Sequence, residues 1–180
     1  MPANTGYNHR DIKKISLGGA GGQNDHYTIL FNDGALYSAA CVESTCRNGQ
    51  LGRTGEQEAL LIVDTNVVDV FTGGWHTHYI KRDGSLFAFG FSGDGRCGIG
   101  TMEPSSTIKE VREMHSQTLM IGNGCFSALL TKEGQVYVAG GTHLHEPHYT
   151  RLELDNVVIE KLVAGVYSTL MLSSTLFVFH

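Results

Sequence analysis

The chain has 180 residues, of which 13 are Lys or Arg and 18 are Asp or Glu, so its formal net charge is −5. Hydrophobic residues make up 41% and charged residues 17%, which is too apolar and too weakly charged for a disordered chain. With 3 prolines and no Gly-X-Y period, the 23 glycines do not indicate a collagen-like chain. Because phosphate contacts need a cluster of Lys and Arg, which this acidic sequence lacks, we expect no direct binding of nucleic acid.

No targeting or membrane segment is visible in the sequence. The first ten residues lack the apolar stretch of a secretory signal, and no apolar run approaches the roughly 18 residues of a membrane-spanning helix. The four cysteines show no Cys-x-x-Cys pair, so they predict reduced thiols in a cytoplasmic or nuclear protein; they are Cys41, Cys46, Cys97 and Cys125. We expect a chain of this length to form one domain.

Hairpin signals recur along the chain at a constant interval. Asp33-Gly34, Asp83-Gly84 and Glu133-Gly134 follow one another 50 residues apart. An apolar segment precedes each pair and a strand-like segment follows it, and an acidic residue before Gly in this setting is a strong signal for a tight β-turn. A fourth copy closes the chain with a shortened turn that lacks the Gly. The strands after the four turns therefore begin at equivalent positions, which are Leu36, Leu86, Val136 and Leu176.

Short strands, Gly-rich turns and a period near 50 residues predict an all-β fold, a partial β-propeller built of small antiparallel sheets. We place the repeats at 12–66, 67–117, 118–156 and, incomplete, 157–180, the third being about ten residues short. The segment from Ser106 to Gln117 has a helical composition, because Ile108, Val111 and Met114 recur every three residues. This spacing is compatible with one or two helical turns between blades.

These repeats resemble those of the regulator of chromosome condensation family. That family's repeat runs from Gly-x-x-His through an apolar strand, Asp-Gly and an aromatic strand ending in Gly, to Gly-Gln-Leu-Gly-x-Gly. The second repeat contains Gly73-Gly74-Trp75-His76, and the first contains Gly49-Gln50-Leu51-Gly52, the most specific tetrapeptide of the family. Phe126 and Ser168 take the His position in the third and fourth repeats, where the resemblance is degraded.

The resemblance implies which residues shape the blades. His26 and His76 are expected to hydrogen-bond the backbone of a neighbouring blade, whereas no partner for His78 can be identified from the sequence. Cys97 stands where the family has the Leu of its tetrapeptide, so we expect it to be a small buried residue. The glycines expected to have structural roles are Gly34, Gly49, Gly52, Gly74, Gly84, Gly90, Gly95, Gly98, Gly124, Gly134, Gly140 and Gly165.

The family's propellers have seven four-stranded blades, whereas this sequence contains three repeats and the front half of a fourth. An open half-propeller would leave sheet faces and edges uncovered. Three explanations stay open at this point. Two copies pair into a closed ring, a different protein supplies the other half, or a shortened form stands open inside a large assembly.

His143, His145 and His148, with Glu146 nearby, form the only candidate metal cluster in the sequence. Three His could hold Zn²⁺ and leave its fourth position open. The spacing matches no recognised metal signature, and Pro147 indicates a loop, so a solvated polar loop is the alternative. We expect no cofactor elsewhere. The stretch 18–22 is Gly-rich, but it lacks the Gly-Lys-Ser/Thr ending of a phosphate-binding loop.

Trp75, the single Trp, is a candidate partner contact because Trp is enriched at interface hot spots, and packing between blades is its alternative role. No catalytic constellation is visible, so the leading hypothesis is a non-enzymatic protein-interaction or scaffold module, or a subunit of a larger complex. Its partner would be a second half-propeller, another copy of the chain or a large assembly. The alternatives are guanine nucleotide exchange on a small GTPase and metal binding through the His loop.

Overall fold

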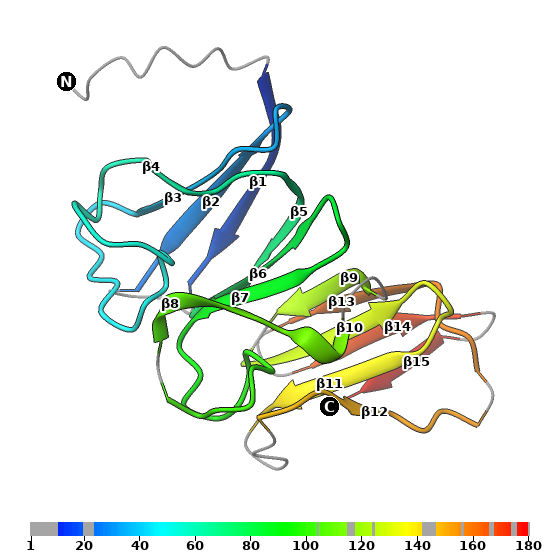
Figure 1. Ribbon diagram of the computed structural model, residues 1–180. Helices are drawn as coiled ribbons and strands as arrows, with labels where there is room; N and C mark the ends of the chain where they lie inside the picture. The colour runs from blue at the N-terminus through cyan, green and yellow to red at the C-terminus, as the bar shows by residue number, and fades with distance from the viewer. Residues whose placement is uncertain are drawn as a thin grey trace.

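The computed structural model describes residues 11–19, 24–103, 105–114, 118–123, 125–141, 147–155, 157–165, 168–173 and 176–179. Four antiparallel sheets, which we call blades 1 to 4, follow one another along the chain (Figure 1). Each sheet is built from strands in chain order, so the fold is an all-β partial β-propeller. None of the helical segments in the described part of the chain has the length and apolarity needed to span a bilayer.

Blades 1 to 3 have four strands and blade 4 has three. Blade 1 contains β1 (Ile12–Gly18), β2 (His26–Phe31), β3 (Leu36–Ala40) and β4 (Leu61–Asp64). Blade 2 contains β5 (Val67–Thr72), β6 (His76–Lys81), β7 (Leu86–Gly90) and β8 (Ser105–Glu110). Blade 3 contains β9 (Thr118–Asn123), β10 (Phe126–Thr131), β11 (Val136–Gly140) and β12 (Thr150–Arg151). Blade 4 contains β13 (Lys161–Ala164), β14 (Thr169–Leu172) and β15 (Leu176–Phe179).

The three acidic-Gly pairs form the turns between the second and third strands of blades 1 to 3. Gly34, Gly84 and Gly134 have φ values of 88°, 88° and 79°, a region that only Gly enters without strain. The carboxylate of Asp33 accepts a bond from Ala35 N–H at 2.9 Å, and Asp83 accepts one from Ser85 N–H at the same distance. The short acidic side chain therefore closes the turn that the sequence predicts.

Of the segment 106–117 the structure describes residues 106–114, and there the expected helical turns are reduced to one 3₁₀ turn. Residues 105–110 form strand β8, and one short 3₁₀ turn follows at Arg112–Met114. The spacing by three has another cause, because Ile108 packs into the core between blades 1 and 2 while Val111 and Met114 belong to the core between blades 2 and 3. Two different cores therefore produced a pattern that resembles one helix face.

The hydrophobic core is divided among the seams where consecutive blades meet. The first strands β1, β5, β9 and β13 lie beside one another from blade to blade (Figure 1). Leu30 and Leu36 of blade 1 are fully buried against Val70 and Tyr79 of blade 2. Similar apolar clusters fill the seams between blades 2 and 3 and between blades 3 and 4. Burial of these apolar side chains holds the blades together.

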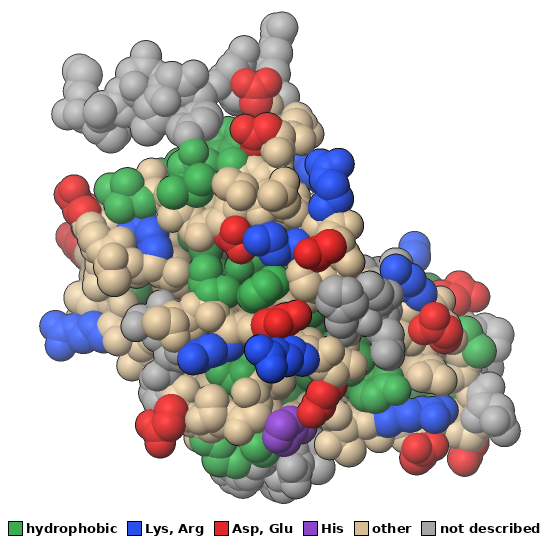
Figure 2. All heavy atoms as spheres, viewed as in Figure 1, with side chains coloured by type: hydrophobic (Ala, Val, Ile, Leu, Met, Phe, Trp, Pro, Cys, Tyr) green, Lys and Arg blue, Asp and Glu red, His purple; other side chains and the backbone are tan. Residues whose placement is uncertain are grey.

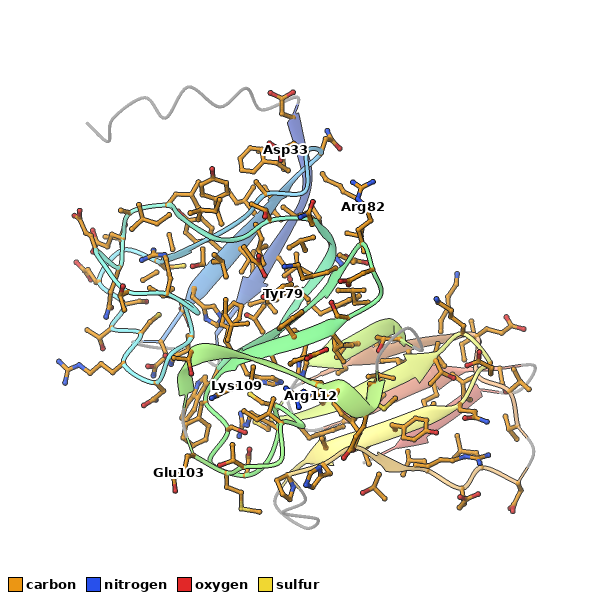
Figure 3. The ribbon with its side chains drawn as sticks, viewed as in Figure 1. Asp33, Tyr79, Arg82, Glu103, Lys109 and Arg112 are labelled. Atoms are coloured by element: carbon orange, nitrogen blue, oxygen red, sulfur yellow. The ribbon has the colours of Figure 1, made fainter. Side chains whose placement is uncertain are left out.

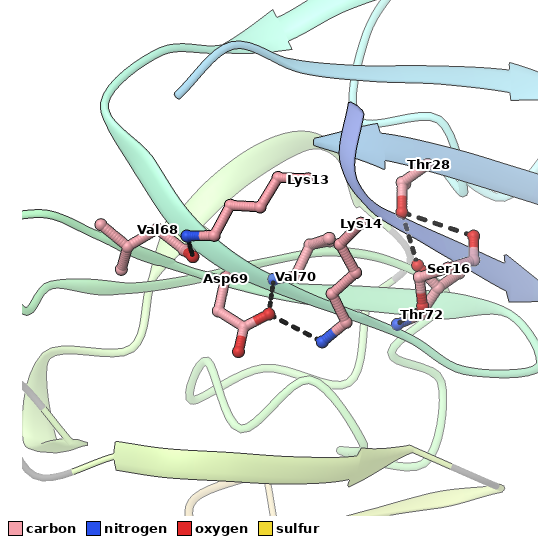
Figure 4. A network of polar contacts seen from close by, with 8 residues as sticks. All are labelled: Lys13, Lys14, Ser16, Thr28, Val68, Asp69, Val70 and Thr72. Atoms are coloured by element: carbon pink, nitrogen blue, oxygen red, sulfur yellow. Dashed lines mark hydrogen bonds and ion pairs between the residues drawn. The ribbon is translucent and has the colours of Figure 1, made fainter. Parts of the chain in front are cut away.

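The seam between blades 1 and 2 also carries polar contacts (Figure 4). Lys14 Nζ lies 2.7 Å from Asp69 Oδ1, and the hydroxyls of Thr28 and Thr72 are 2.9 Å apart. Farther out, Tyr79 lies between the two blades (Figure 3) and donates to Asp64 Oδ2 at 2.7 Å. Each of these contacts joins residues of different blades.

Candidate protein-interaction surface

The connections between strands lie at two edges of the blades. We call one edge the loop rim, which carries the long connections 41–60 and 91–103 together with the short connection 73–75. The opposite edge carries the acidic-Gly turns. Backbone bonds join neighbouring parts of the loop rim, from Cys41 N–H to Asp25 O and from Phe91 N–H to Trp75 O, both at 2.9 Å. Trp75 is therefore positioned by the loop that follows β7.

Trp75 belongs to a compact aromatic and cationic cluster on the loop rim. Its ring meets that of Phe91 edge to face, with the ring centroids 5.2 Å apart. The Arg96 guanidinium carbon lies 5.8 Å from the centroid of Trp75 and 5.2 Å from that of Phe91, which is within the range of a cation–π interaction. Trp75 keeps part of its surface accessible, whereas Arg96 is 7% exposed.

Asp94 compensates for the burial of Arg96. Arg96 Nε lies 2.7 Å from Asp94 Oδ1, and Arg96 Nη2 pairs with Asp94 Oδ2, so the ion pair is bidentate. Burial alone would lower the pKa of Arg96, but the hydrogen bonds and charge of Asp94 outweigh it and raise the pKa. The guanidinium is therefore fixed in its charged form beneath the aromatic pair.

Among blades 1 to 3, the aromatic cluster is found in blade 2 alone. At the positions equivalent to Trp75 and Phe91, blade 1 has Asp25 and Cys41, and blade 3 has Cys125 and Gly141. A residue needed only to build a blade would recur in each repeat. Sequence reasoning singled out Trp75 but missed Phe91, Arg96 and Asp94. Comparing the loops after the third strand of each repeat would have shown the difference.

The rest of the loop rim offers apolar side chains and more exposed acids than bases, Arg47 being an exposed base of the connection 41–60. Val42 and Met102 are exposed hydrophobic residues of the two long connections. Exposed acids accompany them in the same connections; they are Glu43, Glu56, Glu58 and Glu103. On the face shown in Figure 2, Lys and Arg alternate with Asp and Glu, so no broad basic surface is seen there.

Three buried histidines lie behind this surface. His76 Nε2 is 2.7 Å from the hydroxyl of Ser127 in blade 3, and that hydroxyl donates to the Arg96 carbonyl at 2.7 Å. His26 Nε2 lies 3.5 Å from the hydroxyl of Thr77 in blade 2. Both of these contacts cross a seam and join the His to a side-chain hydroxyl.

His78, for which the sequence offered no partner, lies beneath the same seam. Its Nε2 is 3.1 Å from the Cys97 carbonyl and 3.1 Å from the hydroxyl of Tyr149 in blade 3. Cys97 is fully buried, and burial raises its pKa to about 12, so it stays a thiol. All four cysteines are free.

The structural glycines fall at turns and close approaches. A Cβ on Gly140 would lie 2.5 Å from Arg96 Cα, so the Arg96 loop can pass only because this residue is Gly. Gly74 lies in the bend between β5 and β6, and Gly165 donates its N–H to the Ser168 carbonyl. Gly124 lies outside the described residues. The remaining members have positive φ; they are Gly34, Gly49, Gly52, Gly84, Gly90, Gly95, Gly98, Gly134 and Gly140.

The candidate metal cluster is only partly within the described structure. His143 and His145 lie outside the described residues, whereas His148 Nδ1 is 3.2 Å from Glu113 Oε1. Among the described residues, no group of three or more His, Cys, Asp or Glu is arranged to hold a metal ion. His148 instead lines a hollow of about 370 Å³ together with charged residues of β8 and the 3₁₀ turn, among them Lys109 and Arg112 (Figure 3).

No protein-family model matches the chain. The mouse regulator of chromosome condensation is 28% identical over 84% of this chain and 40% of its own length. An RCC1 repeat-containing protein of Dictyostelium discoideum is 25% identical over 86% of this chain and 33% of its own length. The chain thus spans less than half the length of these curated relatives.

The solved structures agree with the sequence relatives on the fold. Prp20p from Saccharomyces cerevisiae superposes with a TM-score of 0.78 at 18% identity, covering 96% of this chain and 45% of its own. The yeast protein is also called RCC1. Together with the period of 50 residues and the blades described above, these similarities show that the chain folds as a partial β-propeller whose repeats are similar to those of the regulator of chromosome condensation.

Proposed function

We propose that the chain is a non-catalytic protein-interaction module that binds its partner through the loop rim of blade 2. The observation that carries this proposal is the cluster of Trp75, Phe91 and Arg96, since blades 1 and 3 have no aromatic residue at the positions of Trp75 and Phe91. Interface hot spots are enriched in Trp and Arg, and this cluster presents a rigid, partly accessible Trp beside exposed apolar residues.

The similarity to Prp20p supports a protein as the partner. Prp20p has binding properties toward Gsp1p and histones, and yeast RCC1 has been crystallised bound to Kap60. The exposed acids of the loop rim favour a partner with a basic surface, because charge complementarity speeds and orients association. We therefore expect the histones to bind more tightly than an acidic protein of similar size.

The test measures binding of purified histones and of Gsp1p to the immobilised chain by biolayer interferometry. Trp75→Ala is expected to weaken binding about tenfold or more, as truncation of a hot-spot residue does. Val158→Ala is the matched control, since Val158 is an exposed apolar residue outside the loop rim. Thermal unfolding of each variant verifies that it is folded.

Equal affinities of the wild type and Trp75→Ala would refute the role of the blade 2 cluster. Release of labelled GDP from Gsp1p, measured with the same protein, distinguishes the alternative function. Accelerated GDP release would indicate that the chain is an exchange factor and would overturn the proposal. Unchanged GDP release together with binding would support the proposal.

A further inference from the structure

The two outermost sheet faces of the fold are apolar and exposed. We call the first the leading face, the outer side of blade 1, which presents Ile15 and Leu17 of β1 and Ile62 of β4. The second is the trailing face, the outer side of blade 4, which presents Val163 of β13 with Leu170 and Leu172 of β14. The exposed fractions of these six side chains lie between 41% and 72%. In Figure 2, hydrophobic side chains are visible on the surface over blade 1.

The same positions form the core wherever two blades meet. By strand register, the equivalents of Ile15 in the later blades are Val70, Ile121 and Leu162, and none is more than 6% exposed. The equivalents of Leu172 in the earlier blades are Leu30, Ile80 and Leu130, and none is more than 8% exposed. The two outer faces therefore have the composition of seams, and apolar faces of this kind mark interaction sites.

The two faces also match each other in chemistry. At the seam of blades 1 and 2, the hydroxyls of Thr28 and Thr72 meet at 2.9 Å (Figure 4). By register, Leu170 takes the position of Thr28 on the trailing face, and Leu17 takes the position of Thr72 on the leading face. A polar pair in the internal seam thus becomes an apolar pair when the trailing face is set against the leading face. Both members of the pair are replaced by Leu, so neither face would bury an unpaired hydroxyl in this contact.

In this structure the two faces do not meet, because blades 2 and 3 lie between blade 1 and blade 4 (Figure 1). The chain covers 45% of Prp20p, so two copies carry nearly the length of that propeller. We propose that the partner on both faces is a second copy of this chain, packed head to tail, with the trailing face of each copy on the leading face of the other. This contact is heterologous and closes once it has been made twice.

The proposal is tested by the mass of the purified chain in solution, measured by light scattering after size exclusion. The expected mass is twice 19.6 kDa. Leu17→Asp and Leu170→Asp each place a charge in the apolar contact, so each variant alone is expected to run as a monomer. Both residues are exposed in the single chain, so neither variant should unfold it. Leu17→Ser and Leu170→Ser provide a milder second pair.

Mixing the two Asp variants gives the decisive result. Leu17→Asp keeps an intact trailing face and Leu170→Asp keeps an intact leading face, so the mixture is expected to recover a heterodimer through one native contact. Val158→Asp, an exposed site on neither face, should leave the dimer unchanged. A monomeric wild type, or a mixture that stays monomeric, would overturn the proposal. This readout does not depend on Trp75, so its failure is distinct from failure of the proposed function.

Discussion

Equivalent hydroxyls in blades 3 and 4 are expected to affect stability with opposite sign. Ser127 and Thr169 occupy the same register position, and both are fully buried. Ser127 meets His76 across its seam, whereas Thr169 faces the seam in which Phe126 has replaced the His. Within the described part of the chain, the Thr169 hydroxyl has no hydrogen-bond partner.

The magnitudes follow from these contacts. Ser127→Ala removes an oxygen that lies 2.7 Å from both His76 Nε2 and the Arg96 carbonyl. At roughly 1 kcal/mol for each bond, the variant should be destabilised by about 2 kcal/mol. Thr169→Val replaces an unsatisfied hydroxyl by a methyl group and should stabilise the fold by about 1 kcal/mol, because the cost of burying the hydroxyl disappears.

The assay is equilibrium urea denaturation followed by circular dichroism and by the fluorescence of Trp75. A change of 1 kcal/mol corresponds to about 2–4 °C in Tm for a chain of this size, so thermal melts provide a second measurement. Phe126→His removes apolar packing from the core between blades 3 and 4, and it should cost less stability in the wild type than in Thr169→Val, since the new imidazole can pair only with the hydroxyl. The reasoning is refuted if Thr169→Val loses as much stability as Ser127→Ala.

Three further predictions concern buried and surface groups. Burial lowers the pKa of His26 from 6.5 to about 4, so the fold favours the neutral imidazole. The free energy of unfolding should therefore fall by up to about 3 kcal/mol as the pH drops from 6.5 toward 4. Urea melts across this pH range test the prediction, and His26→Gln should abolish the pH dependence that His26 contributes. Gly140→Ala should destabilise by about 2 kcal/mol or more in the same melts, because its φ is 79° and the new Cβ would meet Arg96; a neutral effect would contradict the close approach. Lys14→Met should cost less than about 1 kcal/mol, since Lys14 and Asp69 are more than one-third exposed; a larger loss would show that the ion pair holds the seam.

The candidate site could be anticipated only in part. The single Trp beside a Gly pair pointed to Trp75, but the residues that position it come from the loop after β7. Arg96 follows Trp75 by 21 residues, and nothing in the local pattern joins the two. Their contact exists because β6 and β7 pair in register and return both loops to one edge. The spacing of apolar residues in 106–117 predicted a helix for a related reason, since these residues pack into two different seams and not onto one helix face.

The sequence by itself determined the turns, the strands and their repetition, because these depend on local chemistry. An acidic residue and Gly close the hairpins of blades 1 to 3, and Leu36, Leu86 and Val136 each begin the strand that follows. Only the tertiary structure decided which side chains meet across a seam, as His76 meets Ser127 at 51 residues' distance. It also decided that Leu17 is exposed while its equivalents face another blade. Burial depends on the neighbouring sheet, and residues far along the chain supply that neighbour.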